Sequence, residues 1–180
     1  MKWSPFRCEQ DTYDLSHLHP KIIKYVQEAK GDKPARIYTV EIHFSLHCFT
    51  HACQPGEPQE GPLCYRDDRE TRVFDFGRYA LSHRLPEIAE GLMERKCYHT
   101  GRENFFTVEI INGRPGSQIE YEIYFAASRA SRKGIVNLFV QSAYVRDKQH
   151  LGNRPQLKAI RFHVILFNVL NRIPIKTQKF

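Results

Sequence analysis

The segment Ile37–Cys53 reads IYTVEIHFSLHCFTHAC and alternates between apolar and polar side chains. Because successive side chains of a β-strand point to opposite faces, this alternation predicts a strand over residues 37–50 with one buried face. The polar face carries Glu41, His43, Ser45 and His47 in a row. An exposed strand surface does not need a carboxylate, two imidazoles and a hydroxyl in this order, so we expect the polar face to be functional.

The rest of the chain predicts an α+β fold. Apolar residues recur near the helical period from Phe76 to Arg95, where Pro86 either starts a second helix, with Ser82 as a nearby cap, or kinks a single helix. Strand patterns follow over residues 103–111, 118–127, 135–145 and 161–170. We therefore expect an antiparallel meander with helices packed on one face. Residues 1–180 would form a single domain, with an N-terminal extension (1–36) and a Pro/Gly-rich and charged loop (54–70).

Positive charge is concentrated in the second half of the chain. Residues 1–90 carry 12 Lys and Arg against 14 Asp and Glu, whereas residues 91–180 carry 15 against 6. From Ala126 onward there are eleven basic residues and a single acid, Asp147. A basic surface of this kind attracts phosphate polymers, so we expect RNA or another nucleic acid as the partner.

The polar face and the basic strands together predict a nuclease site. Cleavage of RNA without a metal needs a base for the 2′-hydroxyl, an acid for the leaving 5′-oxygen and a cation near the phosphate. Histidine titrates near neutral pH, and arginine donates two parallel hydrogen bonds to phosphate. The predicted catalytic residues are listed in chain order: His43, His47, Arg129, Ser142, Tyr144 and Arg146.

Two other interpretations of the same region remain open. His51, Cys53 and Cys64 are zinc-ligand types on either side of the Pro-rich loop, although the spacing of a zinc knuckle is missing. Aromatic residues on adjacent predicted strands could instead stack on the bases of single-stranded RNA. The five scattered cysteines argue against a disulfide framework. No Gly-rich phosphate loop, G-x-S-x-G elbow or H-E-x-x-H motif is present, which argues against NTPases, α/β-hydrolases and zinc proteases.

The segments ENFFTVEII, IEYEIYFAASRAS, IVNLFVQSAYVRD and AIRFHVILFNVLNRIPIK, within residues 103–176, give the chain a topological resemblance to a known group. A helical segment followed by an antiparallel meander and a basic last strand resembles the RelE/barnase-like small ribonuclease toxin superfamily. The resemblance implies an RNA-cleaving toxin held by a partner antitoxin, and it transfers no catalytic residue because that group has no linear motif.

We therefore expect a metal-independent endoribonuclease without a cofactor. The alternative is a non-catalytic module that binds nucleic acid or protein through its basic C-terminal face, with zinc as a stabilising ion. No apolar run reaches the roughly 20 residues of a membrane helix, and the N-terminus lacks a signal-peptide pattern. These two observations favour a cytoplasmic protein with no membrane partner.

Overall fold

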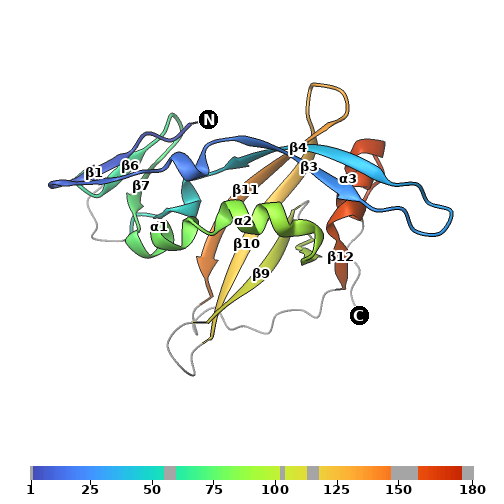
Figure 1. Cartoon of the computed structure of the whole chain (residues 1–180). Coiled ribbons are helices and arrows are strands. Elements are labelled where there is room, and N and C mark those ends of the chain that lie inside the picture. Colours follow the sequence, from blue (N-terminus) through green and yellow to red (C-terminus); the bar gives the residue numbers. More distant parts are fainter. Residues whose placement is uncertain (1, 55–59, 102–103, 113–117, 147–157, 176–180) are drawn as a thin grey trace.

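The computed structural model describes residues 2–54, 60–101, 104–112, 118–146 and 158–175 (Figure 1). In chain order its strands are β1 (Phe6–Cys8), β2 (Asp11–Tyr13), β3 (Lys21–Gln27), β4 (Arg36–Phe44), β5 (Thr50–His51), β6 (Cys64–Arg66), β7 (Thr71–Phe74), β8 (Lys96–His99), β9 (Phe105–Asn112), β10 (Gln118–Arg129), β11 (Ile135–Val145) and β12 (Ala159–Arg161). The helices are α1 (Phe76–Ser82), α2 (Leu85–Glu90) and α3 (Phe162–Asn171), with 3-10 turns η1 (Ser16–Leu18), η2 (Leu46–Cys48) and η3 (Gly91–Met93).

Seven strands form the main sheet in the order β12-β8-β9-β10-β11-β4-β3. The predicted antiparallel meander is present as β9, β10 and β11. The sheet is nevertheless mixed, because β4 lies parallel to β11, from Thr39 opposite Ile135 to Phe44 opposite Val140. An all-antiparallel sheet was therefore the wrong expectation. The mixture of helices and strands is confirmed, whereas the packing of all helices on one face stays a prediction.

One continuous hydrophobic core joins the main sheet to α2 and α3. Tyr25 on β3 illustrates the packing, because its hydroxyl donates to the carbonyl of Ala89 in α2 at 2.5 Å. The ring of Tyr25 also meets the ring of Phe162 in α3, with centroids 5.2 Å apart. Residues 1–36, which we expected to be an extension, thus contribute β3 to the main sheet and Trp3 to the core.

The strand predicted over residues 37–50 ends at Phe44. Ser45 turns the chain, because its backbone N–H donates to the carbonyl of Val140 and its hydroxyl to the carbonyl of Gln141. The same hydroxyl accepts a hydrogen bond from the backbone N–H of His47 and so caps the 3-10 turn η2. A capping serine competes with strand pairing for backbone partners, and this is why alternation alone placed the strand end too late.

The helical segment after Phe74 is divided in two. Asp75 caps α1 by accepting the backbone N–H of Arg78 at 3.0 Å, and α2 begins at Leu85 with Pro86 in its first turn. Proline is tolerated there because the first-turn N–H groups have no partner within the helix. Pro86 therefore starts a second helix, although Ser82 is not its cap.

The last predicted strand, over residues 161–170, is a helix. In α3 the residues Phe162, Ile165 and Leu166 are buried, while Val164 is exposed. Spacing by three and four residues is helical, but it was hidden because seven of the ten residues in this run are apolar, including the unbroken stretch 164–167. The prediction failed because an apolar run without alternation fits a buried strand and a buried helix equally well.

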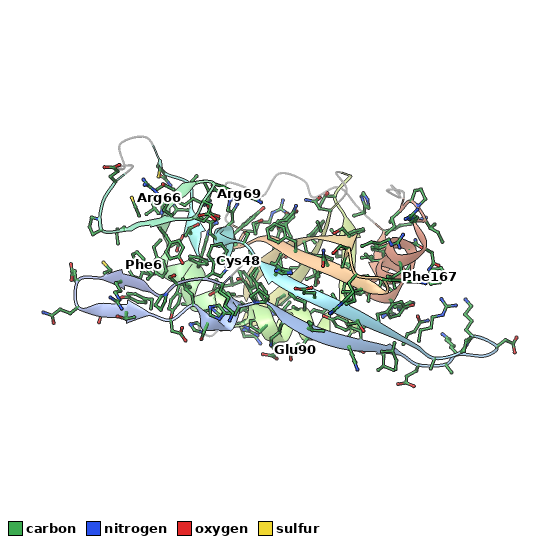
Figure 2. All side chains as sticks on the ribbon, turned by 90° about the horizontal axis from the view of Figure 1, so that it is seen from above. Phe6, Cys48, Arg66, Arg69, Glu90 and Phe167 are labelled. Atoms are coloured by element: carbon green, nitrogen blue, oxygen red, sulfur yellow. The ribbon has the colours of Figure 1, made fainter. Side chains whose placement is uncertain are left out.

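A smaller three-stranded sheet, β5-β7-β6, and the hairpin β1-β2 pack together at one end of the molecule (Figures 1 and 2). The rings of Phe6 and Phe74 stack with centroids 4.0 Å apart, and the indole of Trp3 donates to the carbonyl of Phe44 at 3.0 Å. These contacts hold the β6–β7 hairpin beside the end of β4. In Figure 2 this end carries Arg66 and Arg69, and Phe167 of α3 lies toward the other end.

Candidate functional site

A pocket of about 480 Å³ lies where β4 ends, between η2, β11 and the β6–β7 hairpin. This volume is within the range of small-molecule sites in proteins. Its polar lining includes His43, Ser45, His47, Arg69, Glu70 and Ser142. Three of the six residues predicted to be catalytic, His43, His47 and Ser142, are thus brought together in one hollow.

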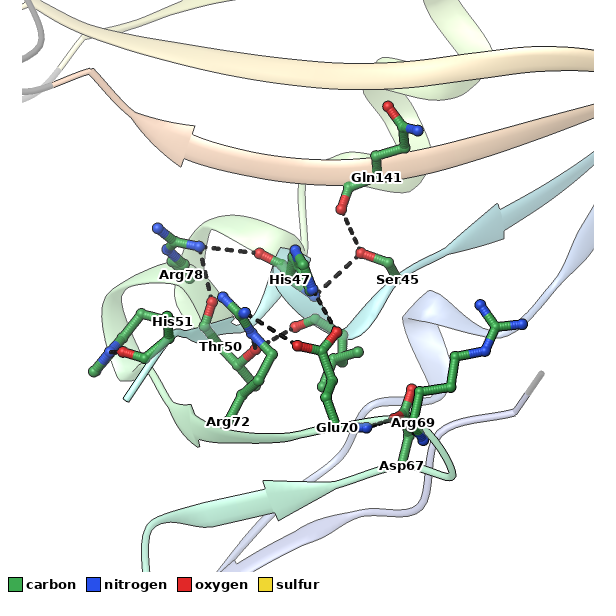
Figure 3. A network of polar contacts seen from close by, with 12 residues as sticks. Ser45, His47, Thr50, His51, Asp67, Arg69, Glu70, Arg72, Arg78 and Gln141 are labelled. Carbon is green, nitrogen blue, oxygen red and sulfur yellow. Dashed lines mark hydrogen bonds and ion pairs between the residues drawn. The ribbon is translucent and has the colours of Figure 1, made fainter. Parts of the chain in front are cut away.

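His47 reaches the pocket from η2 and not from a strand face. Its Nε2 lies 2.7 Å from Oε1 of Glu70 on the opposite hairpin (Figure 3). A carboxylate in this position accepts the Nε2 proton, which leaves Nδ1 of a neutral ring as the basic nitrogen. Within the described part of the chain, Nδ1 of His47 makes no hydrogen bond.

Glu70 is itself held from several directions. Its other oxygen, Oε2, lies 3.3 Å from Nη1 of Arg72, and its backbone N–H donates to Oδ1 of Asp67 at 2.9 Å (Figure 3). Partial burial opposes ionisation of Glu70, but its bonds to His47 and Arg72 outweigh this, so its pKa lies below the ordinary value. The arrangement Arg72–Glu70–His47 fixes the orientation of one imidazole.

His43 lines the pocket from the C-terminal end of strand β4. Its Nε2 lies 3.2 Å from Oε1 of Glu41, so both histidines have a carboxylate partner on the same ring nitrogen. The parallel register places His43 directly opposite Phe139 of β11, a residue that is 41% exposed. An exposed ring beside two imidazoles is a surface on which a planar base can stack.

Arg69 supplies the cation of this pocket, and the sequence analysis missed it. Its backbone N–H donates to Oδ1 of Asp67, which shapes the turn between β6 and β7. Its guanidinium makes no hydrogen bond or ion pair with any residue that the structure describes, and Figure 3 shows it extending from the turn. The turn sequence Arg66–Glu70 is charged, but charge alone does not say which side chains face a pocket.

Arg146 does not line this pocket, contrary to the prediction of a phosphate-binding role. Its Nη1 lies 3.1 Å from Oε1 of Glu122, and the two side chains are only 14% and 2% exposed. The hydroxyl of Tyr124 donates to the other oxygen of Glu122. Arg146 is therefore already committed to a buried carboxylate, which sequence spacing could not reveal.

Tyr144 and Arg129 also lie outside the lining of the pocket. The ring of Tyr144 stacks on Tyr124 with centroids 5.6 Å apart, and the guanidinium of Arg78 lies 5.7 Å from its centroid. Arg129 is exposed at the end of β10, opposite Val136, whereas Ser142 lies near the other end of β11. Of the six predicted residues, His43, His47 and Ser142 thus line the pocket. Arg146 and Tyr144 have other partners, and Arg129 lies away from the pocket.

The zinc alternative finds no support in the arrangement of its residues. His51 on β5 and Cys64 on β6 are separated by the central strand β7, and both lie opposite Val73. Among residues 2–54, 60–101, 104–112, 118–146 and 158–175, no group of three or more His, Cys, Asp or Glu side chains is placed to hold a metal ion. None of the five cysteines, all of which lie in the described ranges, forms a disulfide.

Comparison with known proteins adds a family but no function. No curated protein and no solved structure matches the chain. Within the described part of the chain, no helix is long and apolar enough to cross a membrane. The YjaZ family model matches residues 5–170, a span that includes the whole main sheet and both histidines of the pocket. The chain therefore belongs to the YjaZ family.

Proposed function

We propose that the pocket at the end of β4 cleaves RNA by acid–base catalysis without a metal ion. The single observation that carries the proposal is that two imidazoles, each with a carboxylate on Nε2, line one pocket together with Arg69, whose guanidinium has no partner among the described residues. This set contains the base, the acid and the phosphate-binding cation that transfer of the 2′-oxygen to phosphorus requires.

The geometry favours one histidine as the general base and the other as the general acid. His47 has the better-held ring, because its carboxylate partner is fixed by Arg72 and by a backbone bond to Asp67. We assign His47 as the base that takes the 2′-hydroxyl proton through Nδ1, and His43 as the acid that protonates the leaving 5′-oxygen. Arg69 neutralises the charge that develops on the phosphate, and Phe139 stacks on a base beside the scissile bond.

Single-stranded RNA is the substrate form that fits this assignment. A base that stacks on a side-chain ring must first leave the duplex stack, and unpaired RNA meets that condition. The toxin-like biology and an antitoxin partner remain proposals that follow from the resemblance described above. The basic C-terminal half would add affinity for the RNA backbone without specifying its sequence.

The test is cleavage of a fluorescent single-stranded RNA in EDTA by the wild-type protein and by His47→Ala, with identical purification. We expect wild-type cleavage that ends in a 2′,3′-cyclic phosphate, and a loss of about 10²-fold or more in His47→Ala. His51→Gln is the matched control, since it alters a histidine outside the pocket lining and should cleave at the wild-type rate. Equal rates for wild-type and His47→Ala would overturn the proposal, and salt-sensitive binding without cleavage would favour the non-catalytic alternative.

A further inference from the structure

A second pocket, of about 540 Å³, lies at the opposite end of the main sheet. It is formed by the end of β8, the edge strand β12, the helix α3 and the segment that follows α3. Among the described residues, its lining shares none with the pocket that contains His43 and His47. A ligand in this second pocket would therefore occupy a site separate from the proposed ribonuclease site.

The polar lining of the second pocket consists of hydrogen-bond donors and cations: His99, Lys158, Arg161 and Asn168. Nδ1 of His99 accepts the backbone N–H of Gly101 at 2.8 Å, so the proton of the neutral ring is on Nε2, which is a donor. The guanidinium of Arg161 and the side-chain amide of Asn168 make no hydrogen bond with any residue in the described ranges. No Asp or Glu is among the described lining residues.

The pKa of the neighbouring His163 is affected by positive charges in this region. His163 follows Arg161 by two residues on α3, and its pKa lies below the ordinary value. Burial is the main cause, and the charges of Arg161 and Lys33 add to it by opposing a further positive charge. Burial opposes a charge of either sign, so only the smaller contribution of Arg161 and Lys33 favours an anion here.

The remaining wall of the pocket is apolar and includes Ile160, Val164, Pro174 and Ile175. A bare inorganic ion would leave this wall in contact with water. The guanidinium of Arg161 offers a planar fork of donors and Asn168 adds an amide N–H, a set that suits the several oxygens of a phosphate group. We propose that this pocket binds an organic phosphate, with the phosphate group on Arg161 and Asn168 and an apolar body against Val164.

The test is calorimetric titration of the full chain with n-hexyl phosphate and, separately, with inorganic phosphate. We expect one saturable site for n-hexyl phosphate, at least about tenfold tighter than for inorganic phosphate, because burial of the alkyl chain adds free energy. Arg161→Gln should weaken the binding of n-hexyl phosphate by about tenfold or more. Arg132→Gln removes the same charge from an exposed turn between β10 and β11 and should change affinity by less than about twofold.

A second variant tests the pocket by a different change. Val164→Asp places a carboxylate on an exposed position of the pocket wall, where it should abolish binding without affecting the fold. At saturating RNA the cleavage rate should be the same in Val164→Asp and in the wild-type protein, since Val164 is not among the described residues that line the proposed ribonuclease pocket. Equal weakening by Arg161→Gln and Arg132→Gln, unchanged binding in Val164→Asp, or equal affinity for the two phosphates would each overturn the proposal.

Discussion

Substitution of Arg146 by methionine should destabilise the protein because it breaks a buried ion pair. Glu122 is 2% exposed, and Nη1 of Arg146 lies 3.1 Å from its Oε1. Removal of one partner from a buried pair costs about 3–5 kcal/mol, since the remaining charge has lost its compensation. Tyr124 still donates to the carboxylate, so we expect the lower end, about 3 kcal/mol. In a domain of this size, this corresponds to a fall in Tm of roughly 6–12 °C.

The assay is urea unfolding at pH 7, followed by circular dichroism, on four proteins. Arg129→Met is the matched control, because it removes an exposed arginine from the neighbouring strand and should change the free energy of unfolding by less than about 0.5 kcal/mol. In the double variant Glu122→Gln/Arg146→Met no charge is buried, and it should regain about 1–2 kcal/mol relative to Arg146→Met. A cost below about 1 kcal/mol for Arg146→Met would refute the assignment of Arg146 as a structural residue.

Four further expectations concern titration, thiol reactivity and packing. Because the pKa of Glu70 lies below 4.5, its ionised form stabilises the fold above that pH. The difference in the free energy of unfolding between wild-type and Glu70→Gln, measured in urea, should shrink as the pH falls below 4.5. A constant difference would contradict this expectation. The half-buried His17, which stacks on His83, has its pKa lowered to about 4, so stability should fall as the pH drops from about 6.5 to 4. Substitution His17→Phe should remove up to one proton from that pH dependence, and an unchanged slope would refute this expectation. Burial raises the pKa of the Cys48 thiol to about 12, so Cys48 should remain unmodified by iodoacetamide at pH 8 while half-buried Cys53 reacts. Mass spectrometry measures both modifications, and equal labelling of the two cysteines would be inconsistent with the fold. Leu166→Ala should cost about 3 kcal/mol in urea unfolding, since the side chain is fully buried in α3, and a cost near zero would argue against a helix that packs on the sheet.

Local sequence was sufficient where a single physical rule controls the structure. Alternation located β4 up to Phe44, because one face of a sheet must be apolar and the other polar, and it located β11 at residues 135–145. It did not locate the serine turn after Phe44, since the partners of Ser45 are carbonyls on β11, almost a hundred residues away. His43 and His47 therefore meet in one pocket through a turn, although alternation predicted that they share a strand face.

The sequence by itself determined the strands of the meander and the basic second half of the chain. It also identified the two histidines as candidate site residues. Only the tertiary structure decided which charges remain available to a ligand. Arg146 is neutralised by Glu122, whereas Arg69, on a turn that drew no attention, has its guanidinium in the pocket. The physical reason is that an ion pair depends on distances across strands and between hairpins, and no pattern along the chain contains those distances.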